Sequence, residues 1–160
     1  MNVLFEITIP GNPVPKGRPR FRVITSKAGK NYATAYTDTR TKSAEATIGT
    51  KVLEKMHSTQ LQTLQIDAVA VVLTYYMPIP TSTPKYKREI WAKEYTPHVK
   101  KPDLDNLIKL TLDAICGKGL ILEDDSCVAN IKAWKVYSLN PRTEIAIVGV
   151  EEDATTNNIH

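Results

Sequence analysis

Two groups of aspartates, separated by an amphipathic segment, are the residues of this chain best suited to chemistry. Asp103 and Asp105 stand in KPDLDNL, and Asp124 and Asp125 stand in LEDDSCV. Carboxylate oxygens are the ligands that Mg²⁺ prefers, and the ion keeps waters that it can activate for hydrolysis. The second pair comes just before an expected strand, where the chain can turn back toward the first pair. If two or three of these side chains converge, they would form a metal centre suited to cutting phosphodiesters.

The individual acids also have simpler structural explanations. Asp103 can act as the N-cap of a helix, and Asp105 can form an i,i+4 ion pair with Lys109 that contributes about 0.3 to 0.5 kcal/mol. Asp113 lies about 12 Å further along the same helix, too far to share an ion with Asp105. We therefore expect Asp113 to be structural or a polar surface residue.

A basic arm precedes these acids. Residues 10–30 contain several prolines and glycines and no acid. The segment is too interrupted for a helix and is predicted to be an extended arm that leads into a hairpin around Gly29. The cationic residues of this arm are Lys16, Arg18, Arg20, Arg22, Lys27 and Lys30. A stiffened cationic arm loses little entropy when it docks on a phosphate backbone, so it is a candidate DNA contact.

A second basic segment, residues 84–101, ends in Lys100 and Lys101 and contains several aromatic residues. Lysines can pair with phosphates while bases stack on aromatic rings, so this segment is also a candidate DNA contact. The alternative is a short helix that packs Ile90 and Trp91 on the core and leaves its lysines in solvent. Both interpretations stay open from the sequence alone.

Periodicity predicts the elements that must position these groups. Residues 105–116 are predicted to form an amphipathic helix, because apolar residues recur at helical spacing. The apolar face consists of Leu104, Leu107, Ile108, Leu112 and Ile115. Residues 66–77 are rich in β-branched and aromatic residues, which predicts a central strand buried on both faces. The other predicted elements are a strand over 3–9, a helix over 41–57 and strands over 127–137 and 143–150.

Size and composition are those of one soluble domain. The chain has 160 residues, of which 42% are hydrophobic and 24% charged, and a net charge of +4. We expect a single domain over residues 1–152, followed by a disordered polar tail over 153–160. No apolar run approaches the roughly 18 residues of a membrane span, and the start lacks a basic signal segment. We therefore expect a cytoplasmic protein with no membrane partner, whose two cysteines, Cys116 and Cys127, are reduced.

The acidic region as a whole resembles the core of the RusA family of Holliday junction resolvases. This chain reads PDLDNLIKLTLDAI and then EDDSCV, and the family pattern is close to PDLDNL, a lysine, DA, and a DD pair before a strand. The N-terminal PVPKGRPRFR also resembles the arm of many phage-borne members. The resemblance is tight over residues 101–128 and loose over the arm.

This resemblance implies a set of functional residues. The family's metal-binding aspartates fall on Asp103, Asp105 and Asp125, with Asp124 as a further candidate, and its essential lysine falls on Lys109. We favour Asp125 over Asp124 as the inward ligand. The residues predicted to bind DNA are Lys16, Arg18, Arg20, Arg22, Lys100 and Lys101.

The resemblance also implies a fold, a cofactor and a partner. We expect an α/β (α+β) domain with a mixed β-sheet packed by two main helices, acting as a homodimer on four-way DNA junctions with Mg²⁺, or with Mn²⁺ in its place. Two alternatives stay open: a less selective nuclease of flaps or forks, and a non-catalytic DNA-binding module whose aspartates are caps and salt-bridge partners. Substrate competition separates the first alternative, and an absence of metal-dependent cleavage would favour the second.

Overall fold

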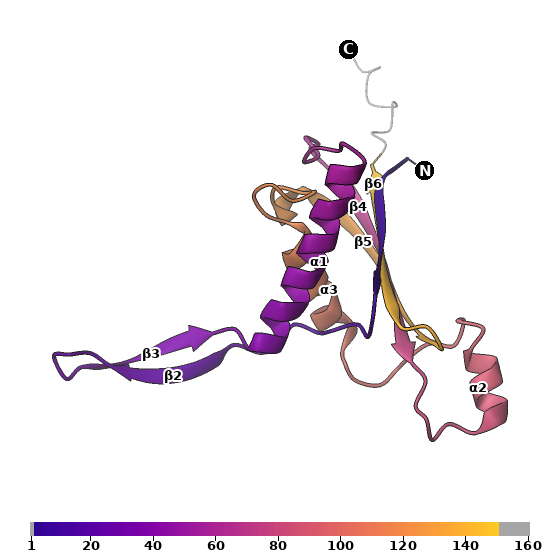
Figure 1. Ribbon diagram of the computed structural model, residues 1–160, viewed down its shortest axis with the longest axis horizontal. Coiled ribbons are helices and arrows are strands. Elements are labelled where there is room, and N and C mark those ends of the chain that lie inside the picture. The colour runs from indigo at the N-terminus through magenta and orange to yellow at the C-terminus, as the bar shows by residue number, and fades with distance from the viewer. Residues whose placement is uncertain (1, 151–160) are drawn as a thin grey trace, which may run out of the picture.

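A four-stranded β-sheet forms the centre of the protein in the computed structural model, which describes residues 2–150. Its strands are β1 (Val3–Pro10), β4 (Val69–Pro78), β5 (Val128–Ser138) and β6 (Arg142–Gly149), and the two long helices are α1 (Thr39–Ser58) and α3 (Leu104–Ile115). The strand order is β1-β6-β4-β5, with β6 antiparallel to both neighbours and β5 parallel to β4. Both helices lie on one face of the sheet (Figure 1). The predicted α/β (α+β) fold is confirmed, whereas the predicted tail over 153–160 lies outside the described residues.

Strand β4 has one buried face and one half-buried face. Its inward side chains are at most 4% exposed, and they are Val69, Val71, Leu73, Tyr75 and Met77. The side chains between them, such as Val72 and Thr74, are only half-buried. The predicted burial of this strand on both faces is therefore wrong, because α1 and α3 cover only one side of the sheet. Apolar content alone does not reveal which face of a strand is covered.

The two long helices build the core together with β4. Asp38 caps α1 by accepting a hydrogen bond from the Thr41 backbone N–H over 2.9 Å. The buried apolar side chains are Ile48, Val52 and Met56 of α1 and Leu107, Leu110, Ala114 and Ile115 of α3. Both predicted helices are confirmed to within two residues at each end. Among residues 2–150, no helix is both long and apolar enough to cross a membrane.

The buried face of α3 differs from the predicted one. Leu110 and Ala114 are buried, although neither was placed on the apolar face. Ile108 and Leu112, which were placed there, are only half-buried. The difference arises because α3 packs against α1 as well as against the sheet, which turns one edge of its apolar face toward solvent.

The basic arm ends in a β-hairpin that projects from the body of the protein (Figure 1). Strand β2 (Arg20–Thr25) pairs antiparallel with β3 (Asn31–Tyr36) as a separate two-stranded sheet. Gly29 in the connecting turn has a φ of +77°, a conformation that glycine adopts without steric cost. The predicted hairpin around Gly29 is confirmed, and both of its faces are largely exposed.

The second basic segment contains a short helix, α2 (Lys85–Trp91), that lies apart from the core (Figure 1). Trp91 stacks on Tyr137 of β5, with ring centroids 4.0 Å apart. Ile90 is 54% exposed, so the alternative in which both Ile90 and Trp91 pack on the core applies to Trp91 alone. Adjacent helical residues point in different directions, and the contact through Trp91 turns Ile90 toward solvent.

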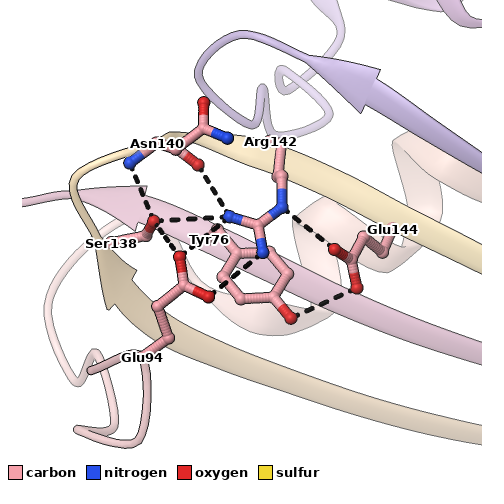
Figure 2. Close-up of polar contacts among 6 residues, drawn as sticks. All are labelled: Tyr76, Glu94, Ser138, Asn140, Arg142 and Glu144. Atoms are coloured by element: carbon pink, nitrogen blue, oxygen red, sulfur yellow. Dashed lines mark hydrogen bonds and ion pairs between the residues drawn. The ribbon is translucent and has the colours of Figure 1, made fainter. Parts of the chain in front are cut away.

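An ion-pair network anchors the chain that follows α2, and Figure 2 shows its members. The Arg142 guanidinium donates to both carboxylate oxygens of Glu94, over 2.9 and 3.1 Å, and to Glu144 over 2.9 Å. The Cζ carbon of the Arg142 guanidinium lies 3.5 Å from the ring centroid of Tyr76. The Ser138 hydroxyl also donates a hydrogen bond to Glu94. The network therefore links β4, β5 and β6 to the segment that leads into α3.

Candidate active site

The first pair of predicted acids stands at the beginning of α3 and is exposed. Asp103 occupies the N-cap position, with φ of −69° and ψ of 142°, but its side chain makes no capping hydrogen bond. Asp105 follows in the first turn, and it forms no ion pair with Lys109. The Asp103 carboxylate therefore does not cap the helix, and the Asp105 carboxylate does not pair with Lys109, which were the two structural roles that the sequence suggested.

Lys135 of β5 holds the chain at the entrance to α3. Its Nζ donates to the carbonyl oxygens of Lys100 and Pro102, over 2.6 and 2.5 Å. Burial lowers the pKa of this ammonium, while the negative charge of Asp103 acts in the opposite direction. Lys135 thus fixes the backbone before Asp103 and places a positive charge near it. Lys135 was not among the residues predicted from the sequence, because its place beside Tyr75 depends on the pairing of β5 with β4.

The second pair of acids stands beside the other end of α3. Asp124 accepts a hydrogen bond from the backbone N–H of Ser126 over 2.8 Å. Hydrogen bonding from the Ser126 side chain, together with this backbone bond, lowers the pKa of the Asp124 carboxyl group. The side chain of Asp125 is exposed, and its carboxylate has no hydrogen-bond or ion-pair partner among residues 2–150. Both acids line a shallow pocket together with Asp113 and Cys116. Asp124 is thus engaged locally, and Asp125 is the carboxylate of the pair that is available for a ligand.

The two cysteines next to this pocket are free thiols, as predicted. Burial raises the pKa of Cys116 to about 12, and the negative charge of Asp125 adds to the effect. Burial also raises the pKa of Cys127. Both groups are therefore protonated near neutral pH and are poor nucleophiles.

The structure does not gather the predicted metal ligands within one chain. Helix α3 has 12 residues, so its ends are about 18 Å apart at 1.5 Å per residue. The predicted return of the chain toward the start of α3 is wrong, because Leu122 pairs with Cys116 and thereby holds the following residues at the C-terminal end. Within residues 2–150, no three His, Cys, Asp or Glu side chains are placed to hold a metal ion. The donor atoms suit Mg²⁺, but their arrangement in a single chain does not.

The predicted DNA-binding residues fall into two groups. Lys16 does not present a free ammonium, because its Nζ lies 2.5 Å from Glu45 Oε1 and 2.7 Å from Asp113 Oδ2. Burial opposes the charged form, yet the hydrogen bonds to these two carboxylates raise the pKa of Lys16 above its ordinary value. The other predicted residues are exposed, and they are Arg18, Arg20, Arg22, Lys100 and Lys101. Asp113 thus has the structural role that was expected of it.

Exposed acids at both ends of one helix, with a projecting basic hairpin nearby, are features of a protein that acts on nucleic acid. Residues 10–148 match the family described as Endodeoxyribonuclease RusA, and the chain belongs to that family. It is therefore an endodeoxyribonuclease of the Holliday junction resolvase class, which hydrolyses phosphodiester bonds in branched DNA and generally depends on a divalent metal. The chain is also similar to the uncharacterized protein YqaN of Bacillus subtilis (strain 168), with 31% identity over 150 residues that cover 89% of this chain and 94% of that protein.

Proposed function

We propose that this chain resolves four-way DNA junctions by paired, symmetric, Mg²⁺-dependent nicks during recombination and repair. The observation that carries the proposal is that Asp103, Asp105 and Asp125 are exposed carboxylates without a hydrogen-bond or ion-pair partner among residues 2–150. Exposed acids that repel DNA are costly unless a cation joins them. We propose these three as the metal ligands, with Mn²⁺ as the alternative ion; since the length of α3 separates Asp125 from the other two within one chain, they could share an ion only if a second copy of the chain brings them together.

Lys109 is the residue proposed to contact the scissile phosphate. It is exposed in the middle of α3, one turn from Asp105, and it has no ion-pair partner among the described residues. An ammonium in this position neutralises the charge that develops on the phosphate as its bond breaks. A bound divalent ion would supply an activated water for the hydrolysis.

DNA binding is assigned to the exposed cations of the arm and of the segment before α3. Arg20 and Arg22 lie on one face of the hairpin, and the Arg22 guanidinium lies 5.8 Å from the ring centroid of Tyr36. Lys100 and Lys101 lie beside Asp103, next to the proposed scissile phosphate. Contacts of this kind release counterions, so binding should weaken steeply with salt.

We also propose a homodimer that acts in the cytoplasm. A four-way junction has near two-fold symmetry, and a two-fold dimer would present one site to each of two opposed strands. This arrangement would give paired cuts at symmetric positions.

The test compares an immobile four-way junction with linear duplex of the same sequence, in Mg²⁺, in Mn²⁺ and in EDTA. Paired symmetric nicks on the junction, abolished by EDTA, are expected. Equal cutting of both substrates would instead show a less selective nuclease, and competition with flap and fork substrates would then identify its preference. Binding without cutting in any metal would overturn the proposed assignment of the acids.

A further inference from the structure

Tyr95 and Val99 are the most exposed large apolar side chains among residues 2–150, at 85% and 86%. Both belong to the segment that follows α2 and leads into α3 (Figure 1). Single exposed apolar side chains are normal on a protein surface and need no explanation. Here, however, the backbone that carries them is fixed from several sides, whereas surface loops are usually mobile.

Residues 95–99 are attached to the outer edge of β5. The Tyr137 N–H donates to the Thr96 carbonyl over 3.1 Å, and the His98 N–H donates to the Lys135 carbonyl over 2.8 Å. These two bonds give the segment the geometry of a short antiparallel strand. Side chains of a strand point alternately to its two faces.

Tyr95, Pro97 and Val99 therefore share one face, and we call these three residues the apolar row. Pro97 is bridged to Val136, which is in register with the outward-facing Tyr76 of β4. The apolar row thus extends the open face of the sheet, the face that neither α1 nor α3 covers (Figure 1).

Trp134 continues this apolar surface on β5. It lies two residues from Val136, on the same face, and it is 52% exposed. In the antiparallel register set by Pro97 and Val136, Val99 is level with Trp134. The exposed apolar surface is therefore formed by two chain segments, which is a feature of interaction sites rather than of a single stray side chain.

The opposite side of residues 95–99 is held by aromatic packing. His98 lies against Tyr137 with ring centroids 4.6 Å apart, and Trp91 stacks on the same Tyr137 ring at 4.0 Å. Tyr137 itself is buried. The segment is thus anchored through its inner side chains, and this anchoring turns the apolar row toward solvent.

Glu94, directly before Tyr95, has a φ of +63°, a conformation that costs energy for any residue other than glycine. Conformations of this kind persist only where the surrounding structure holds them, and they are common at functional sites. Here Arg142 donates two hydrogen bonds to the Glu94 carboxylate, and Ser138 donates a third (Figure 2). The direction in which the chain leaves Glu94, and with it the position of Tyr95, is fixed.

Positive charge surrounds the apolar row. Lys93, Lys100 and Lys101 are exposed, and Glu94, which is the only acid among residues 93–101, is paired with Arg142. Nucleic acid matches this combination, because its phosphates pair with lysines while its bases stack on aromatic rings.

We propose that the apolar row covers nucleobases exposed at the branch point of the DNA, with the Tyr95 ring stacked on one of them, and that this contact makes the enzyme prefer junctions to duplex. The inference rests on the proposed function, because it names the feature of the substrate that the same enzyme recognises. In a continuous duplex each base pair is covered by a neighbour on both sides. A base pair at a branch point can lose one neighbour, so only the branched substrate offers a base face to Tyr95.

The apolar row lies close to the proposed site of cleavage. Val99 and Asp103 are four residues apart, so the chain between them spans at most about 14 Å. This length corresponds to about four base-pair steps of roughly 3.4 Å. Lys135 donates to the carbonyls of Lys100 and Pro102 in the intervening chain, which keeps the separation constant.

Equilibrium binding tests the inference, with an immobile four-way junction and a linear duplex of the same sequence, in EDTA so that no strand is cut. Tyr95→Ala should weaken junction binding by about tenfold or more, the usual effect of losing an aromatic ring that stacks on a base, and leave duplex binding unchanged. Tyr95→Phe keeps the ring and should bind like the wild type. Urea unfolding should show no loss of stability in either variant, because the side chain is exposed.

The matched control is Tyr86→Ala, which removes a ring from α2 that is 62% exposed and should change neither affinity. Photocrosslinking provides a second readout. Iodouracil at the branch point should crosslink to Tyr95, identified by mass spectrometry of the peptide, whereas iodouracil a full helical turn away within an arm should not.

Two binding results would overturn the inference while leaving the proposed function standing, provided that the wild type cuts junctions. One is unchanged junction affinity in Tyr95→Ala, and the other is an equal loss of junction and duplex affinity. A changed oligomeric state in sedimentation, with the preference for junctions intact, would show that the apolar row is a protein contact and would also overturn it. A wild-type protein that neither prefers nor cuts junctions would overturn the proposed function itself.

Discussion

The strongest structural prediction concerns the pair of Glu94 and Arg142. The change Glu94→Gln keeps the size of the side chain and removes its charge. In the native protein, the Arg142 guanidinium donates two parallel hydrogen bonds to this carboxylate, and the Ser138 hydroxyl donates a third. A neutral amide can replace only part of this set, and it leaves Arg142 with Glu144 as its remaining acidic partner.

The expected loss of stability depends on how far the side chains of Arg142 and Glu94 are exposed to solvent. Hydrogen bonds to charged groups contribute about 1.5 to 3 kcal/mol each when well enclosed. The Arg142 and Glu94 side chains are 16% and 31% exposed, so solvent screens the pair only in part. We expect Glu94→Gln to lower the free energy of unfolding by about 2 kcal/mol, which for a domain of this size lowers Tm by about 4 to 8 °C.

The pH dependence of this loss has a definite sign. The hydrogen bonds from Arg142 hold the pKa of Glu94 below its ordinary value of 4.5. A carboxyl group with a lowered folded-state pKa adds stability above its unfolded pKa, and that stability disappears as the pH falls through the folded value. The difference in stability between wild type and Glu94→Gln should therefore be full at neutral pH and shrink progressively below about pH 4.5.

Urea unfolding followed by circular dichroism, at neutral pH and at about pH 3, measures both effects. Glu89→Gln is the matched control, because Glu89 is exposed on α2 and has no ion-pair partner among residues 2–150. The reasoning is refuted if Glu94→Gln is no less stable than this control at neutral pH. A deficit of the same size at both pH values would show that lost packing, rather than lost charge, is responsible.

Three further changes probe the site and the core. Asp105→Asn should reduce junction cleavage by about 100-fold or more while leaving binding intact, because a metal ion contributes several kcal/mol to such reactions; cleavage at the normal rate in Mg²⁺ would remove Asp105 from the ligand set. The double change Arg18→Ala and Arg20→Ala should weaken junction binding and reduce the salt slope of log K by about 2, as measured by titration at several salt concentrations; an unchanged slope would mean that the arm does not contact phosphates. Tyr75→Phe should lower the free energy of unfolding in urea by about 1 kcal/mol, because it removes the 2.8 Å hydrogen bond to Thr111. Thr111→Val should lower it further, because it leaves the buried Tyr75 hydroxyl unpaired. Equal stability of the wild type and both variants would argue against this bond.

Local patterns were sufficient to predict most of the elements. Helix α3 was found because its apolar residues recur every three or four positions, and the hairpin because Gly29 stands between two strand-like runs. Neither pattern depends on distant parts of the chain.

The errors arose where a residue's environment depends on distant contacts. The ion pair of Lys16 with Asp113 joins the arm to α3, and no local pattern reveals it. The position of Asp125 depends on the pairing of Leu122 with Cys116, which decides the end of α3 at which the chain leaves. In both cases the residue types were informative about chemistry, but their distances were set by the tertiary fold.

The attachment of the hairpin to the body has a consequence for where the DNA is cut. The Gly17 N–H donates to Thr41 of α1, and a side chain at Gly17 would collide with Asp38, so the base of the hairpin is closely seated. The neighbouring Lys16 bridges α1 and α3. The six-residue strands of the hairpin extend about 20 Å from this anchor, a length equal to roughly six base pairs of DNA. A hairpin held this firmly to the helix that carries Asp105 would act as a ruler, setting a constant spacing between the phosphates it grips and the bond that is broken.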